Sequence, residues 1–203
     1  MRFFKWKIFG VTAVVCLVPI VLGIILWDKL PDRMAIHFNV YGVADNFASK
    51  RIVVFGIPLL MLAFQTFCCF VNDISYKGQK VEKRSEYVAK WIIPVITVVL
   101  YVITLGYGMG LAIDMRKTTA FIVGVLLVVT GSCLPQLNTF RKNETDDEKA
   151  RKITRITKRG AVIFGILFMA NIFLPPICTV ISVGLLILCS VVYVVYGIIS
   201  VRK

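Results

Sequence analysis

The sequence predicts an all-α integral membrane protein with six transmembrane helices, and three observations support this fold class. Of its 203 residues, 58% are hydrophobic, and the mean hydropathy is +0.83. Soluble domains do not have such a composition. The apolar residues form runs long enough to cross about 30 Å of hydrocarbon, which takes roughly 20 residues of helix. The basic residues, which give a net charge of +13, stand mainly in the segments between these runs.

We predict one membrane domain over residues 1–203, with spans near 8–27, 52–71, 91–113, 118–140, 158–174 and 177–199. The first run follows MRFFKWK but ends in LWDKLP without a small-residue cleavage site, so we expect an anchor rather than a removed signal peptide. The fifth run is the shortest. It must begin before Arg159, tilt its neighbours or thin the bilayer.

Several residues inside the runs have a structural interpretation. Prolines stand at positions 19, 58, 94 and 135, within predicted helices, where they are tolerated as kinks because neighbouring groups can satisfy the carbonyls that proline leaves free. Glycines at 106, 108, 110, 124 and 131 allow helices to approach closely. Gln65 and Asn171 are predicted to be interhelical hydrogen-bond donors rather than parts of an ion path. The predicted spans hold too few ionisable groups for a carrier of charged substrates.

The distribution of basic residues predicts the orientation. Only six of the 24 Lys and Arg residues fall in the loops after the first, third and fifth spans: Lys29, Arg33, Lys50, Arg51, Arg116 and Lys117. The other 18 fall in the alternate set of segments. Basic residues concentrate in cytoplasmic loops, so we expect both termini inside and the loop 28–51 outside. Because the charges lie in short segments rather than on one face, no nucleic-acid partner is predicted.

The outer loop LPDRMAIHFNVYGVADNFASK holds the only histidine of the chain. Apolar residues alternate from Met34 to Val40, which predicts an extended segment. A reversal should follow, with Gly42 at positive φ and Asn39 or Asp45 bonded to its own backbone neighbours. Asp45 or Ser49 can then cap the second span.

His37 has three possible interpretations. A metal site would need Asp32 or Asp45 as further ligands, and a catalytic base would need a nucleophile that the sequence does not offer. The default is a hydrogen-bonded histidine in a loop at the membrane surface. We therefore predict no enzyme, no catalytic residue, no metal and no cofactor.

The inner segment RKNETDDEKARKITRITKRG is the most charged part of the chain. From Glu148 to Arg159 it places Ile153 and Ile156 on one side among basic residues, which is typical of a short amphipathic helix on the anionic inner leaflet. A plain solvated connector fits equally well. If this segment binds a cytoplasmic partner, the docking candidates are Arg151, Lys152, Arg155, Lys158 and Arg159.

The outer loop resembles the signature of the SdpI-like membrane protein family, roughly L-P-x-x-[IM]-P-x-H-[FW]-[ND]-x-x-G-x-x-D-x-x-x-[SP]-K. The matching residues are Leu30, Pro31, His37, Phe38, Asn39, Gly42, Asp45, Ser49 and Lys50. Ala35 stands where proline is usual. The resemblance continues through GIPLLM and WIIPVI over the first half of the chain. In the second half, GSCLPQ replaces the usual G-N-x-[LM]-P-K, and no R-T-P-W type motif follows.

This resemblance implies a multi-pass protein of the bacterial cytoplasmic membrane. The best-known members protect a toxin producer from its own secreted peptide, and members can relay its presence by holding a small repressor at the membrane. It implies contact with an extracellular antimicrobial peptide through Pro31, His37, Phe38, Asn39, Gly42, Asp45, Ser49 and Lys50. The alternative is an accessory subunit of a membrane transport or export complex, packed on its partner through the small residues of the third and fourth spans.

Overall fold

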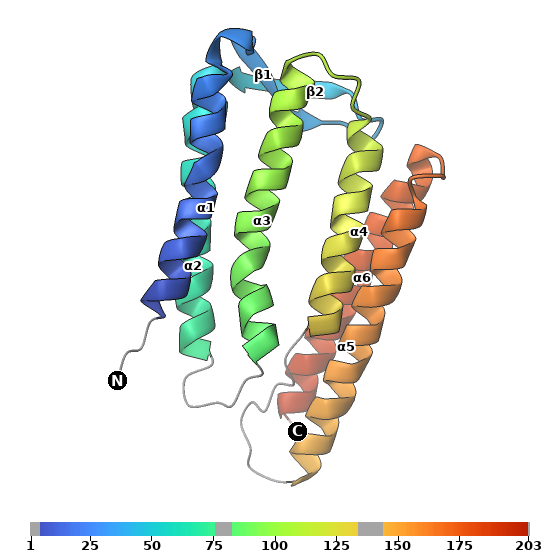
Figure 1. Ribbon diagram of the computed structural model, residues 1–203. Helices are drawn as coiled ribbons and strands as arrows, with labels where there is room; N and C mark the ends of the chain where they lie inside the picture. Colours follow the sequence, from blue (N-terminus) through green and yellow to red (C-terminus); the bar gives the residue numbers. More distant parts are fainter. Residues whose placement is uncertain (1–4, 76–82, 134–143, 203) are drawn as a thin grey trace.

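In the computed structural model, α-helices run side by side and a two-stranded hairpin lies across one end (Figure 1). The structure describes residues 5–75, 83–133 and 144–202. The helices are α1 (Trp6–Ile25), α2 (Ile57–Ser75), α3 (Lys83–Gly108), α4 (Met115–Cys133), α5 (Glu144–Ala170) and α6 (Pro176–Arg202). Strands β1 (Arg33–Phe38) and β2 (Ala44–Ser49) form the hairpin, and a π-helix (Ile52–Gly56) leads into α2. α1 begins and α6 ends at the end opposite the hairpin (Figure 1).

Four helical segments among the described residues are long and apolar enough to cross a membrane: Trp6–Ile25, Ile52–Ile74, Lys83–Gly108 and Met115–Cys133. A shorter apolar helical stretch runs over Pro176–Val192. Together these helices indicate a multi-pass membrane protein. The six-span topology and its orientation stay predictions.

The predicted limits of the third and fourth spans need correction. α3 ends at Gly108 rather than near 113, because the chain turns at Gly110, which has a φ of +86°. The amide of Leu111 bonds to the carbonyl of Gly106, and that of Gly110 to the carbonyl of Tyr107, a Schellman ending. α4 begins at Met115, and the predicted end of this span, 134–140, lies outside the described residues.

The inner amphipathic segment is also different from the prediction. Glu148–Arg159 is not a separate helix, because α5 runs without interruption from Glu144 to Ala170 and joins this segment to the predicted fifth span. Nothing in the segment breaks a helix before Gly160, and an isolated glycine is tolerated inside one. The charged half of α5 therefore continues the line of its apolar half.

Side chains on neighbouring helices satisfy the carbonyls freed by two of the prolines, as predicted. Pro58 has no N–H to offer the carbonyl of Val54, and the hydroxyl of Tyr101 on α3 donates to that carbonyl at 3.4 Å. Pro94 likewise frees the carbonyl of Lys90, and Gln65 Nε2 on α2 donates to it at 2.9 Å. Hydrogen bonds therefore join α2 to α3 at both prolines.

A second polar feature lies among α1, α2 and α3, at the end opposite the hairpin. Lys90 Nζ lies 2.5 Å from Asp73 Oδ1 and 3.2 Å from Glu86 Oε1, and Lys5 pairs with Glu86. We call Lys5, Asp73, Glu86 and Lys90 the charge cluster. The side chains of Lys90 and Asp73 are only 1% and 7% exposed. Lys90, which the sequence placed before the third span, is therefore buried within α3, where two carboxylates compensate its charge.

Glycines bring α4 and α5 together, as predicted for positions 124 and 131. A Cβ on Gly124 would lie 2.7 Å from the carbonyl oxygen of Gly165, and one on Gly131 would lie 2.7 Å from the Cβ of Ala161. Backbones this close leave no room for a side chain, which is the packing that small residues allow in membranes.

Candidate functional site

The hairpin is the predicted outer loop, and its turn confirms the predicted chemistry. Gly42 has a φ of +79°. Asn39 Oδ1 accepts hydrogen bonds from the amides of Tyr41 and Val43, at 3.0 and 3.1 Å. The amide of Asn39 also donates to the carbonyl of Val43. Asn39 therefore holds the turn, and we call residues 39–43 the hairpin tip.

The strands do not alternate regularly, and this corrects the predicted period of two. The pairing joins Ala35 to Phe47 and His37 to Asn46, and then Phe38 to Ala44, so that Ile36 and Asp45 are extra residues. Met34 and Ala35 are consequently both buried, whereas Ile36 is 44% exposed. Such bulges re-aim side chains.

The bulge at Asp45 brings this residue to the only histidine. His37 Nδ1 lies 2.5 Å from Asp45 Oδ1, and both side chains are largely exposed. This confirms a hydrogen-bonded loop histidine. It also shows that Asp45 does not cap the second span. Ser49 is the better candidate for that role, since the amide of Ile52 lies 3.5 Å from its Oγ.

Several contacts hold the hairpin against the helices. The ring of Phe38 meets Tyr107 of α3 edge to face, with centroids 4.9 Å apart. Met34 is 1% exposed, and its methyl group would lie 2.9 Å from a Cβ placed on Gly108. At the base, Lys50 Nζ lies 3.1 Å from Asp32 Oδ1. The hairpin is therefore a fixed element rather than a free loop.

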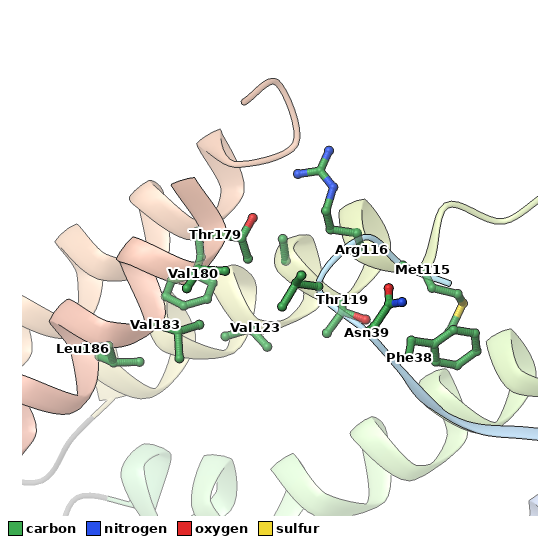
Figure 2. A pocket seen from close by; sticks show the side chains of 14 residues that line it. Phe38, Asn39, Met115, Arg116, Thr119, Val123, Thr179, Val180, Val183 and Leu186 are labelled. Carbon is green, nitrogen blue, oxygen red and sulfur yellow. The ribbon is translucent and has the colours of Figure 1, made fainter. Parts of the chain in front are cut away.

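The hairpin tip also contacts α4. A Cβ on Gly42 would stand 3.0 Å from the backbone nitrogen of Arg116, so only glycine fits this approach without displacement. Beside this contact is a cavity of about 450 Å³, here called the hairpin cavity, between the hairpin and α4, α5 and α6. In Figure 2, Val180 and Val183 of α6 face the α4 side, and Phe38 and Asn39 come from the hairpin.

The predicted contact residues do not converge on one site. Phe38, Asn39 and Gly42 line the hairpin cavity. The other predicted residues do not line it: Pro31, His37, Asp45, Ser49 and Lys50. Sequence reasoning missed the cavity wall from α4 and α6. It assigned Arg116 to a short loop between two predicted spans, whereas the structure places Arg116 at the start of α4, and Thr179 stands in an ordinary apolar run.

At the other end, the predicted docking residues share α5. Arg151, Lys152, Arg155 and Arg159 are exposed, whereas Lys158 is half-buried and its carbonyl lies beside Gly131 of α4. In the part of the chain that the structure describes, no group of three or more His, Cys, Asp or Glu side chains is placed to hold a metal ion.

A comparison with family models finds one match. Residues 14–62 match a domain of unknown function, DUF1648, which is found in SdpI-like membrane proteins. No curated protein and no solved structure matches the chain. The matched residues run from α1 through the whole hairpin into α2, so the domain match covers the loop that carries the resemblance.

Proposed function

We propose that this chain is an SdpI-like protein of the bacterial cytoplasmic membrane that gives immunity to, or senses, a secreted antimicrobial peptide. Its termini face the cytoplasm and its hairpin faces outward. The domain match over residues 14–62 supports the family. The orientation rests on the 18 basic residues of the segments assigned to the inside, against six outside.

The observation that carries the proposal is the apolar surface of the hairpin. Tyr41, Val43 and Val40 are 71%, 59% and 53% exposed, although they stand on an element beyond the ends of the helices. Ile36 and Phe47 add 44% and 43%. Grouped apolar side chains that a protein leaves uncovered mark surfaces for binding.

The hairpin is also suited to bind a peptide with little loss of entropy. Its tip is fixed by Asn39, and its strands are held by Phe38, Met34 and Lys50, so few of its bonds need to be ordered on binding. A two-stranded sheet offers unpaired backbone groups along its edges. An extended peptide can add a strand there while its apolar side chains cover those of the hairpin.

Survival of a sensitive bacterium tests this function. Cells that express the chain should survive a secreted antimicrobial peptide that kills cells without it, and Tyr41→Ser with Val43→Ser should abolish the protection. Phe173→Ser is the matched control, because Phe173 is an exposed aromatic residue in the turn between α5 and α6, outside the hairpin. Protection by the double variant equal to that of the unaltered chain would exclude the hairpin as the contact.

Labelling in intact cells tests the orientation separately. In a background without the six native cysteines, an impermeant thiol reagent should label the Tyr41→Cys variant and leave the Arg151→Cys variant unlabelled until the cells are opened. Both positions are exposed, so accessibility within the protein does not decide the result. The reverse pattern would invert the proposed topology.

A further inference from the structure

The hairpin cavity has an almost wholly apolar wall. Apart from Arg116, Thr119 and Thr179, the residues that line it from the helices are apolar. Its volume of about 450 Å³ lies within the range of roughly 300–1,000 Å³ typical of sites for small molecules. Water is poorly held by so few polar groups, so the cavity is suited to a hydrocarbon ligand.

The cavity runs along α4, one of the helices long and apolar enough to cross a membrane. Its lining extends along α4 from Met115 to Val123 and along α6 from Thr179 to Leu186, which at 1.5 Å per residue is about 10–12 Å of helix. Val180 and Val183 are 44% and 40% exposed, so this side of the cavity is open at the α6 surface. A lipid chain in the bilayer can therefore enter sideways.

One charged group lines the cavity, and it is a cation. Arg116 Nη1 donates to the carbonyls of Asn171 and Leu174, at 3.1 and 3.0 Å. Both bonds use the same nitrogen, and the guanidinium carries further N–H donors on Nη2 and Nε. The nearby carboxylate of Asp114 accepts from the amide of Lys117 and pairs with its ammonium group. No acidic side chain is among the lining residues.

We propose that the hairpin cavity binds an anionic phospholipid of the surrounding leaflet. One acyl chain lies between α4 and α6, and the phosphate accepts from Arg116. Arginine recognises phosphate through paired N–H donors, and basic sites between membrane helices hold lipid headgroups. A peptide is a weaker fit, because the opening at Val180 and Val183 faces the depth at which lipid chains lie. This ligand is additional to the peptide of the proposed function.

Native mass spectrometry of the full chain tests the proposal. The protein in mild detergent is offered equal amounts of phosphatidylglycerol and phosphatidylcholine, and the mass of each retained molecule identifies it. We expect one phosphatidylglycerol per chain, preferred by about tenfold. Both lipids offer the same phosphate, so the preference comes from the choline cation of phosphatidylcholine, which the charge of Arg116 repels; a tenfold ratio corresponds to about 1.4 kcal/mol. Arg116→Gln should remove the preference. Lys117→Gln, which changes a neighbouring charge outside the lining, should keep it.

Two further variants do not depend on the contact of Arg116 with the end of α5. Val183→Trp fills the cavity and should abolish retention of both lipids, whereas Val192→Trp, an exposed position farther along α6, should not. Equal retention of the two lipids would overturn the proposal. So would a retained fatty acid in place of phospholipid, or equal effects of Arg116→Gln and Lys117→Gln. Since survival is not the readout, failure here leaves the proposed immunity untouched.

Discussion

The two parts of the helical bundle hold together in opposite ways. α1, α2 and α3 are joined by polar side chains, including the charge cluster and the hydrogen bonds of Gln65 and Tyr101. α4 and α5 are joined by glycines that bring backbones into contact. In a bilayer, apolar side chains gain nothing by leaving lipid, so close packing and hydrogen bonds must provide the attraction between helices.

The difference teaches that a substitution in the polar part costs more stability than one in the glycine-packed part. A buried charge is tolerated only while its partner is present. At a glycine contact, the loss of stability depends on the volume of the side chain that is added. The hairpin is attached to the polar part through Tyr107 of α3, so the proposed recognition surface depends on the more demanding half of the molecule.

The largest effect is expected from Lys90→Met. This change leaves Asp73 and Glu86 buried without their shared cation, and breaking such a pair costs about 3–5 kcal/mol of the free energy of unfolding. Thermal unfolding in detergent measures the loss. Lys117→Met is the control, because that lysine pairs with Asp114 where both side chains are 48% exposed, and such pairs contribute less than about 1 kcal/mol. If Lys90→Met and Lys117→Met lost equal stability, the charge cluster would not be a stabilising contact between α2 and α3.

The next largest effect is expected in the glycine-packed part. In Gly124→Ala, the new methyl group would stand 2.6 Å from Met169 Cγ and 2.7 Å from the carbonyl oxygen of Gly165. Overpacking of this kind costs about 1–3 kcal/mol. Gly184→Ala on α6 meets nothing within 4 Å and should be neutral or stabilising, since alanine favours helix. The same unfolding measurement decides whether the two glycines differ.

A smaller effect is expected from Gln65→Leu. The variant frees the carbonyl of Lys90 and the hydroxyl of Thr12 from the amide that donates to them, at 2.9 and 3.0 Å. Interhelical hydrogen bonds in membranes contribute about 1–2 kcal/mol. Thr66→Val removes only a bond within α2, to the carbonyl of Leu62, and should cost less. If the order of these two losses is reversed, the bond at Pro94 does not join the helices.

The smallest effect is expected where the two parts meet, at the start of α4. Asp114 Oδ1 accepts from the amide of Lys117 at 3.0 Å, which caps the helix. This bond, with the charges of Lys117 and Arg116, lowers the pKa of Asp114, although desolvation opposes the shift. The stabilisation is therefore present above about pH 3.9, the ordinary value, and is lost as the pH falls through the lowered pKa.

Asp114→Ala checks this cap. We expect a loss of roughly 0.5 kcal/mol near neutral pH, at the lower end for a helix cap because the side chain is exposed. The loss should shrink as the pH falls below the ordinary carboxyl value. A difference from the unaltered chain that stays constant across that range would show that the carboxylate charge plays no part.

Much of the fold could be predicted because its signals are local. The apolar runs determine the helices, and the ranges predicted near 8–27, 52–71 and 177–199 agree to within three residues with the helical segments Trp6–Ile25, Ile52–Ile74 and Pro176–Arg202. The turn at Gly42 follows from the conformational freedom of glycine. The need for other donors to the carbonyls of Val54 and Lys90 follows from the missing N–H of Pro58 and Pro94. The end of α3 was harder, because either Gly108 or Gly110 could have stopped the helix.

By itself, the sequence determined that this is a chain of membrane-type helices with an extended segment and a turn between the first two. Only the tertiary structure decided that a bulge brings Asp45 to His37, that two carboxylates compensate a lysine inside α3, and that Gly42 rests on Arg116 beside a cavity. The physical reason is the separation along the chain between the residues that interact. Hydropathy and turn chemistry act between neighbours along the chain, whereas the charge cluster and the cavity join residues that meet only after the helices have packed.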